Sequence, residues 1–236
     1  MINWQHLFLP LLTVPQYLFC ANSIVCYSFK THPSNKLEYS IFVHNKKSLC
    51  EVSLDDSDKN YPVYMIDESY EYFQDTVIDF DDVKTAFCKS FSKSNEVFKS
   101  ADALYFDEVK NKLVFVEFKN GKVKGIKEKL KDSLLVFSDI ATVDLEFCRK
   151  HCEYIVVYNY EANKKYVEDE KQKLEEKTKS QTVDREYMKL ANTISKYAKE
   201  ELVLWDLNIM KGICVSDIHT YDTDEFKNSY TKNHIL

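Results

Sequence analysis

The sequence predicts an α/β fold in which a mixed β-sheet is flanked by helices. The chain has 236 residues, of which 44% are hydrophobic and 14% aromatic, enough to bury one good-sized core. Apolar residues recur at helical spacing in some segments and alternate at strand spacing in others. The expected core elements are a helix over 81–99, a hairpin of strands over 102–107 and 112–119, a helix over 123–139 and a strand over 153–160.

The first helix is predicted from a stripe of large apolar residues. Val83, Phe87, Phe91 and Phe98 lie on one face of a helix over 81–99. The strand 112–119 is predicted from its period-2 alternation, because successive side chains in a strand point to opposite faces.

The second strand of the hairpin carries two charged residues on one face. Glu117 and Lys119 project from the same side of the strand as Leu113 and Phe115. A purely structural strand would continue this row with further apolar residues. A buried charge is costly unless it is paired or bound to a metal. The charged pair therefore indicates a functional site rather than a purely structural strand.

Metal-assisted hydrolysis of a phosphodiester requires charged residues in this arrangement. Asp102 and Glu117, on adjacent strands, would hold Mg²⁺ or Mn²⁺ while water and a phosphate oxygen complete the coordination. The metal would lower the pKa of a bound water and neutralise charge on the attacked phosphate. Lys119 would help to place the nucleophile and stabilise the charge that develops.

These residues resemble a known motif. Asp102 with Glu117-Phe118-Lys119 is similar to the core motif of the PD-(D/E)XK nuclease superfamily, with Ala101 where the family name has proline. The resemblance implies a restriction-endonuclease-like core: a helix, three strands with the motif on the second and third, a helix and a further strand. It also implies a metal-dependent nuclease that acts on DNA or RNA, such as a restriction-like or defence-related enzyme.

The resemblance covers about residues 81 to 160 and suggests one more acidic residue. Many members place such a residue on the first helix, where it supports the metal or its water, and Glu96 matches by position. The alternative is that Glu96 is a surface glutamate. Asp107 and Glu108 are interpreted as turn residues of the hairpin, since turns favour polar side chains.

The charge distribution bears on nucleic-acid binding. A net charge of −6 and a pI near 5.6 argue against a chain that coats nucleic acid through bulk electrostatics. The segment 119–131 nevertheless holds six lysines against one acidic residue. We expect Lys122, Lys124 and Lys127 to contact the phosphate backbone there. The alternative is an ordinary solvated helix face.

Glycine and cysteine usage excludes several classes of protein. With only three glycines, the chain has neither a P-loop nor a dinucleotide-binding fingerprint. The seven cysteines include no Cys-x-x-Cys pair, so a zinc site and a secreted disulfide framework are both poorly supported. Buried free thiols in a reducing cytoplasm are the expected state.

The N-terminal segment is ambiguous. Leu7 to Phe29 carries no charge and is long enough to span a bilayer. Pro10, Pro15 and Gln16 interrupt it, and no basic residue precedes it as a signal peptide requires. We therefore expect a cytoplasmic protein that is not inserted in a membrane.

The flanking regions complete the expected organisation. Residues 1–75 form an N-terminal addition with a hairpin over 37–54, residues 76–220 form the nuclease-like core, and residues 221–236 form a polar, frayed tail. Within the core we expect an exposed helix or a mobile excursion over 164–182 and an amphipathic helix over 183–202. Strands are expected over 202–207 and 213–218.

The sequence leaves three functions open. The first is a metal-dependent nuclease, for which a homodimer would be natural if both strands of a duplex are cut. The second is a catalytically silent α/β module that binds nucleic acid or a protein through the Lys-rich face. The third is a nucleotidyltransferase-like enzyme, although that class usually needs a Gly-rich turn before its first helix and this chain is poor in glycine.

Overall fold

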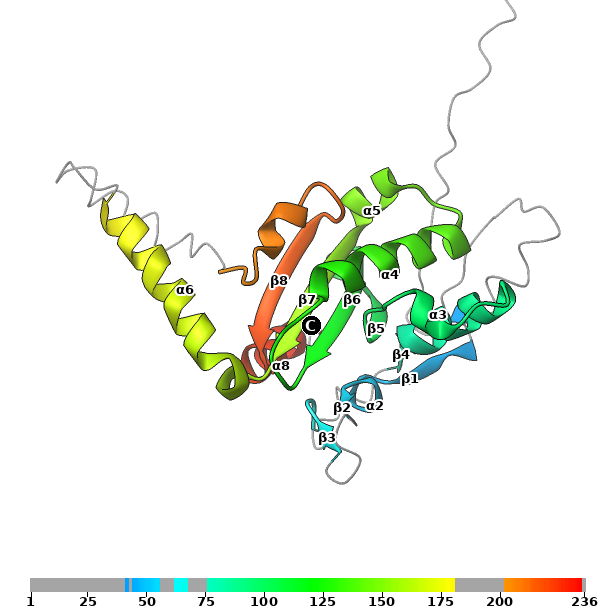
Figure 1. Cartoon of the computed structure of the whole chain (residues 1–236), viewed down its shortest axis with the longest axis horizontal. Helices are drawn as coiled ribbons and strands as arrows, with labels where there is room; N and C mark the ends of the chain where they lie inside the picture. Colours follow the sequence, from blue (N-terminus) through cyan, green and yellow to red (C-terminus); the bar gives the residue numbers. More distant parts are fainter. Residues whose placement is uncertain (1–40, 43, 56–61, 68–75, 181–201, 235–236) are drawn as a thin grey trace, which may run out of the picture.

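A six-stranded mixed β-sheet forms the centre of the protein (Figure 1). The computed structural model describes residues 41–42, 44–55, 62–67, 76–180 and 202–234. In the order in which they lie side by side, the strands are β1 (Lys46–Ser48), β4 (Thr76–Asp79), β5 (Ala103–Asp107), β6 (Lys112–Lys119), β7 (Cys152–Tyr158) and β8 (Asp217–Asp222).

Helices connect and cover these strands. The α-helices are α2 (Leu49–Val52), α3 (Phe80–Ser90), α4 (Ile126–Ala141), α5 (Leu145–His151), α6 (Tyr160–Ser180) and α8 (Thr223–His234). Two 3₁₀ turns, η3 (Asn95–Val97) and η4 (Leu207–Met210), and a small pair of strands, β2 (Leu54–Asp55) and β3 (Val63–Tyr64), complete the described elements.

The two halves of the sheet differ in strand direction. β1, β4, β5 and β6 pair antiparallel, whereas β6, β7 and β8 pair parallel. A parallel neighbour needs a crossover, and α4 and α5 supply it between β6 and β7 (Figure 1). The predicted α/β class, a mixed sheet flanked by helices, is confirmed.

Each face of the sheet has its own apolar core. On one face Phe115 of β6 meets Phe80 and Phe137 edge-on, with ring centroids 5.2 and 5.6 Å apart, and this joins α3 and α4 to the sheet. On the other face Phe118 packs against Phe226 of α8 at 6.0 Å. The alternation of β6 therefore sends 113, 115 and 117 towards α3 and α4, and 114, 116 and 118 towards α8.

The central helices and strands lie close to their predicted ranges, except that one helix ends earlier than predicted. The hairpin, the helix after it and the strand near 153–160 are confirmed as β5–β6, α4 and β7. The helix predicted over 81–99 stops at Ser90, because Ser92 adopts a left-handed φ of 56° and the Lys93 N–H turns back to the Cys88 carbonyl at 2.9 Å. Residues beyond it form a turn and η3.

The strand order departs from the resemblance at one point. The resemblance implies a strand between the first helix and the motif hairpin, but α3 runs directly into the segment before β5 and the additional strand, β4, precedes the helix. In space β4 still lies beside β5, with Ile78 opposite Leu104. Three antiparallel strands followed by a parallel one are therefore present, connected in a different order.

The hairpin predicted over 37–54 is wrong for the part that the structure describes. Ser48 caps a short helix: its hydroxyl accepts the Glu51 N–H at 3.1 Å, and the Glu51 carboxylate accepts the Ser48 N–H at 2.7 Å. Lys46–Ser48, which lies within that predicted hairpin, pairs with β4 as β1.

The C-terminal region is more ordered than predicted. Residues 202–207 form no strand, the strand expected over 213–218 appears as Asp217–Asp222, and the tail continues as α8 with Phe226 buried. The exposed helix expected over 164–182 is present as α6, which extends away from the sheet (Figure 1). Most of the helix predicted over 183–202 lies outside the described residues.

The uncharged run from Leu7 to Phe29 also lies outside the described residues. In the part of the chain that the structure does describe, every helix is too short or too polar to cross a bilayer. Among the cysteines there, Cys88, Cys148 and Cys152 are buried free thiols, and the thiol of Cys214 is free and partly exposed.

Candidate active site

The segment before β5 fixes Asp102 at the edge of the motif hairpin. The Ala101 N–H donates to the Ser133 hydroxyl of α4 at 2.7 Å, and the Asp102 N–H donates to the Val116 carbonyl at 2.9 Å. The Asp102 side chain then accepts the Phe118 N–H through Oδ2 at 2.5 Å. Its other oxygen, Oδ1, remains available to α4.

Glu117 and Lys119 lie on the same face of β6, as predicted. The Lys119 ammonium is 2.6 Å from Oε1 of Glu117, and the register Ala103↔Val116 places Asp102 beside Glu117 on the neighbouring strand. The Glu117 side chain is 0% exposed, whereas those of Asp102 and Lys119 are 17% and 22% exposed. The three residues predicted from the sequence therefore come together in one cluster.

Lys129 of α4 completes the cluster. Its ammonium nitrogen is 2.7 Å from Oε1 of Glu117 and 3.3 Å from Oδ1 of Asp102, so it bridges the two carboxylates. In the sequence, Lys129 stands out only as one member of the Lys-rich run. A signal is nevertheless present: Lys129 lies one turn before Ser133 and one turn after Ile126, within the stripe that α4 buries.

Glu117 keeps unused capacity to bind a ligand. The closest contacts of both ammonium groups are with Oε1, and neither oxygen of Glu117 has a partner in hydrogen-bond geometry among the described residues. A fully buried carboxylate normally accepts several hydrogen bonds, because an unsatisfied buried charge is expensive. Oε2 in particular is a free ligand atom inside the protein.

Burial and mutual repulsion shift the pKa values of the cluster. Burial, together with the charge of Glu117, raises the pKa of Asp102 to about 8, while Lys129 and the Phe118 N–H oppose the shift. Burial also raises the pKa of Glu117. For Lys129, burial alone would lower the pKa, but the charges of Glu117 and Asp102 outweigh it and raise the pKa.

The raised pKa of Asp102 makes stability depend on pH. Between the ordinary pKa of 3.8 and about 8, the folded state holds a proton that the unfolded state has lost, so stability falls as pH rises through that window. Asp102→Asn cannot ionise and still accepts the Phe118 N–H. We expect the melting temperature of this variant, relative to wild type in metal-free buffer, to increase from pH 5 to pH 8 and then level off. A difference that stays constant with pH would contradict the assignment.

The donor set fits a hard divalent cation. Mg²⁺ is commonly held by one or two carboxylates, with waters and a substrate phosphate in the remaining positions. Asp102 and Glu117 are two such carboxylates, and the unpartnered Oε2 of Glu117 supports the fit. Within the described ranges no group of three or more acidic, histidine or cysteine side chains is arranged to hold a metal, so the site would depend on this pair.

Asp81, not Glu96, is the acidic residue that the first helix brings near the site. Glu96 is exposed on η3, outside the helix on which it was expected, because α3 ends at Ser90. Asp81 lies in the first turn of α3 and accepts a hydrogen bond from the Ser100 hydroxyl. In addition to burial and the charge of Glu117, its carboxylate contributes to the raised pKa of Asp102.

The lysines expected to contact nucleic acid lie before and at the start of α4. Lys122 and Lys124 are exposed, and Lys127 is partly exposed and 3.9 Å from Asp206. They follow directly on β6, which ends at Lys119. The loop is attached to α6, since Val123 and Gly121 both hydrogen-bond to the Asn163 side chain.

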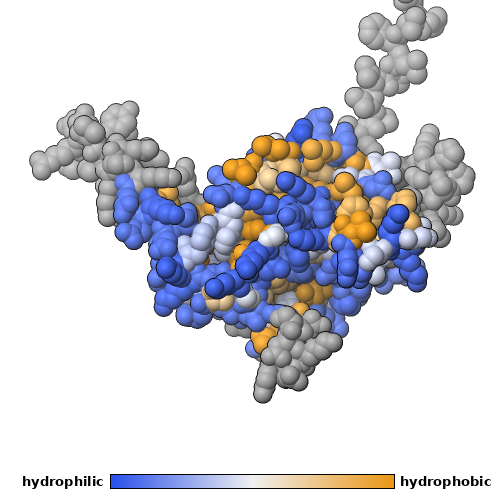
Figure 2. Space-filling view, viewed as in Figure 1, coloured by the Kyte–Doolittle hydropathy of each residue, from blue (hydrophilic) through white to orange (hydrophobic). Residues whose placement is uncertain are grey.

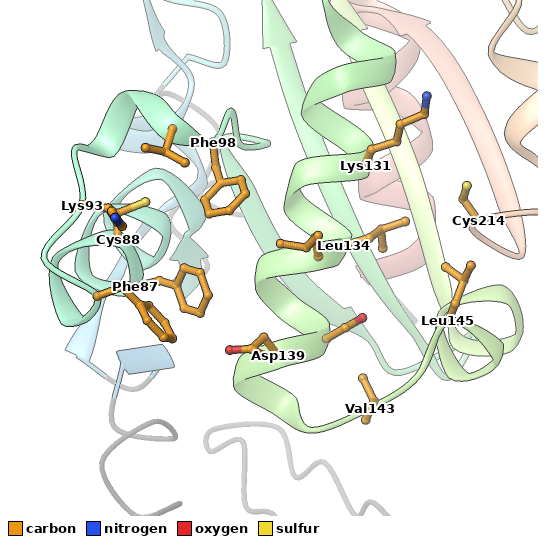
Figure 3. Close-up of a pocket in the computed structure, with 14 residues that line it drawn as sticks. Phe87, Cys88, Lys93, Phe98, Lys131, Leu134, Asp139, Val143, Leu145 and Cys214 are labelled. Atoms are coloured by element: carbon orange, nitrogen blue, oxygen red, sulfur yellow. The ribbon is translucent and has the colours of Figure 1, made fainter.

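The Glu117 carboxylate is sealed from solvent, so the cluster does not open to solvent at this residue. A groove of about 970 Å³ lies elsewhere, lined by residues of α3, α4 and α5 such as Phe87, Leu134 and Leu145 (Figure 3). Figure 2 shows exposed hydrophobic residues on the same side of the molecule as α3 and α4, whereas α6, on the opposite side, presents a hydrophilic surface. None of the cluster residues lines the groove.

Comparison of the chain with protein-family models, with curated proteins and with solved structures gives no match.

Proposed function

We propose that the protein is a metal-dependent nuclease whose active site is formed by Asp102, Glu117 and Lys119. The observation that carries the proposal is the buried Glu117 carboxylate, which has an unpartnered oxygen beside a second carboxylate and two lysines. A packing role does not account for such a group, because burying an incompletely satisfied charge destabilises the fold. Residues that break the rules of stability are typical of functional sites.

Each residue has a distinct part in this proposal. Asp102 and Glu117 would hold the divalent cation, which supplies a nucleophilic water at neutral pH and charge stabilisation at the phosphate. Lys119 directs its ammonium into the same space, where it would orient the nucleophile and stabilise developing negative charge. The backbone bond from Phe118 keeps Asp102 in place, so the two carboxylates are oriented before substrate binds.

The direct test is a cleavage assay with purified full-length protein on single-stranded and double-stranded DNA and RNA. We expect cleavage of at least one substrate in the presence of Mg²⁺ or Mn²⁺ and none in EDTA. Asp102→Asn serves as the matched inactive variant. Absence of cleavage on every substrate with either metal would contradict the proposal.

The exposed lysines before α4 would bind the phosphate backbone. Replacing Lys122 and Lys124 together with alanine should weaken nucleic-acid binding about equally for all sequences. The slope of log K against log salt should become shallower by about 0.9 for each duplex phosphate that the variant no longer neutralises. The control is the double alanine variant of two exposed lysines, Lys89 in the last turn of α3 and Lys93 in the turn that follows it. If both double variants bind equally weakly, the Lys122 and Lys124 surface is removed from the proposal.

A second function is favoured by one observation. Lys129 bridges Asp102 and Glu117, and Lys119 contacts Glu117, so ammonium groups already pair with both carboxylates without a metal. This is the arrangement that a catalytically silent binding module would have. Binding of nucleic acid without cleavage, and unchanged by EDTA, would support that function.

The proposal extends to assembly and location. If the substrate is a duplex cut on both strands, two copies of the chain would act together as a homodimer. A cytoplasmic location is proposed as well, supported by the buried free thiols. Sedimentation in the presence of duplex and cell fractionation of the full-length protein test these two points.

A further inference from the structure

The position of Lys129 is unusual for a lysine beside a metal site. Among the described residues, its ammonium is the only cation in ion-pair contact with both Asp102 and Glu117. A divalent cation shared by those carboxylates would have to enter the space that this nitrogen now borders. Lys129 and the metal are therefore in competition for the same oxygens.

The charges of the cluster sharpen this competition. When Asp102 and Glu117 are both ionised, as metal binding requires, two carboxylates face two ammonium groups and the charges balance. A divalent ion would add two positive charges to a site from which water is largely excluded, where repulsion between like charges is strong. Binding of the metal therefore requires that an ammonium leaves or that an anion arrives.

The Lys129 side chain can move away from the two carboxylates, and a position for its ammonium group is available nearby. Its side chain is 20% exposed and is carried on a flexible four-carbon stem. It lies in the first turn of α4, directly after the loop that carries Lys122 and Lys124. A phosphate bound there would attract the ammonium away from the carboxylates.

We propose that Lys129 is a positioning residue that holds Asp102 and Glu117 as an internal counter-ion until substrate arrives, and then moves to a substrate phosphate as the divalent cation binds. The inference rests on the proposed nuclease function and adds its regulation. Metal and nucleic acid then bind cooperatively, and the metal alone binds weakly. The site is thereby protected from divalent ions when no substrate is present.

The test is Mn²⁺ binding by the full-length protein without nucleic acid, measured by calorimetry and by electron paramagnetic resonance. Lys129→Met should bind Mn²⁺ at least about tenfold more tightly than wild type, because it removes the competing charge. Lys131→Met is the matched control, since it makes the same charge change on the same helix at an exposed position. Addition of Glu117→Gln to Lys129→Met should abolish the gain.

Two further measurements do not depend on the folding of one variant. Lys129→Gln should give the same direction of change. Wild type should bind Mn²⁺ about tenfold more tightly with an uncleavable phosphorothioate oligonucleotide present, after correction for Mn²⁺ bound by the oligonucleotide itself. Equal Mn²⁺ affinities for wild type with and without the oligonucleotide, or for Lys129→Met and Lys131→Met, would overturn the inference.

The outcomes separate the two proposals. Cleavage by wild type together with unchanged Mn²⁺ affinity in Lys129→Met overturns the role of Lys129 alone. Tighter Mn²⁺ binding by Lys129→Met, with no cleavage of any nucleic acid by wild type, overturns the nuclease function and leaves Lys129 as a permanent substitute for the metal.

Discussion

Glu117→Gln should reduce metal-dependent cleavage on the order of 10³-fold or more, because the amide keeps the size of the side chain but removes the charge that would hold the cation. Glu117 is fully buried and contacts Lys119 and Lys129, so its loss changes the centre of the cluster. The initial rate of cleavage under saturating metal is the quantity to measure. The loss should appear in kcat/KM for every substrate that wild type cleaves.

The control for this variant is Glu108→Gln, the same chemical change in the exposed turn at the other end of the hairpin. It should cleave like wild type. Thermal unfolding of both variants checks that they are folded. Since an ionised Glu117 is costly to bury, Glu117→Gln should not be less stable than wild type above neutral pH. Residual activity near the wild-type level would contradict the assignment of Glu117 as a ligand.

Lys119→Met should lower kcat by about 10²- to 10³-fold with little change in KM, because it removes one preorganised charge that is directed at the reacting phosphate. Methionine retains much of the length of the apolar stem. Lys112→Met, on the same strand at its opposite end, is the matched control and should leave kcat unchanged. A rise in KM without a fall in kcat would show that Lys119 only binds substrate.

The motif hairpin could be predicted because its signals are local. The alternation along β6 fixes which side chains share a face, and the turn between the strands is stabilised by Asp107, whose carboxylate accepts the Lys110 N–H at 2.9 Å. Asp102, Glu117 and Lys119 follow from that register. That these three side chains lie close together can be predicted from the hairpin alone.

Lys129 and Asp81 belong to helices, and their part in the site depends on tertiary packing. Lys129 faces the carboxylates only because α4 crosses the sheet with Leu130, Ser133 and Phe137 buried beneath it. The rotation of a helix against a sheet is not encoded in a three-residue motif. A charged residue inside an apolar helical stripe is the one local sign, and the dense run of neighbouring lysines obscures it.

The structures of residues 48–54 and of the C-terminal tail were predicted wrongly for two different reasons. In residues 48–54 the alternation that suggests a strand competes with the capping box of Ser48 and Glu51, and the capping box decides the local structure. At the C-terminus, Phe226 lies in a polar segment but fills the apolar face left by Phe118. Only the folded structure shows that this apolar face of the sheet has to be shielded from water by another element.

The claim that Asp102 and Glu117 together bind a divalent cation is tested most directly by crystallography of wild-type protein with Mn²⁺ and an uncleavable phosphorothioate oligonucleotide. Anomalous scattering of manganese locates the metal independently of its ligands. The account predicts an anomalous peak at about 2.2 Å from an oxygen of each carboxylate, close to the distances known for Mg²⁺, with the Lys129 ammonium displaced towards a phosphate. A map with no peak there, in which Lys129 still bridges Asp102 and Glu117 while the oligonucleotide is bound, would contradict it.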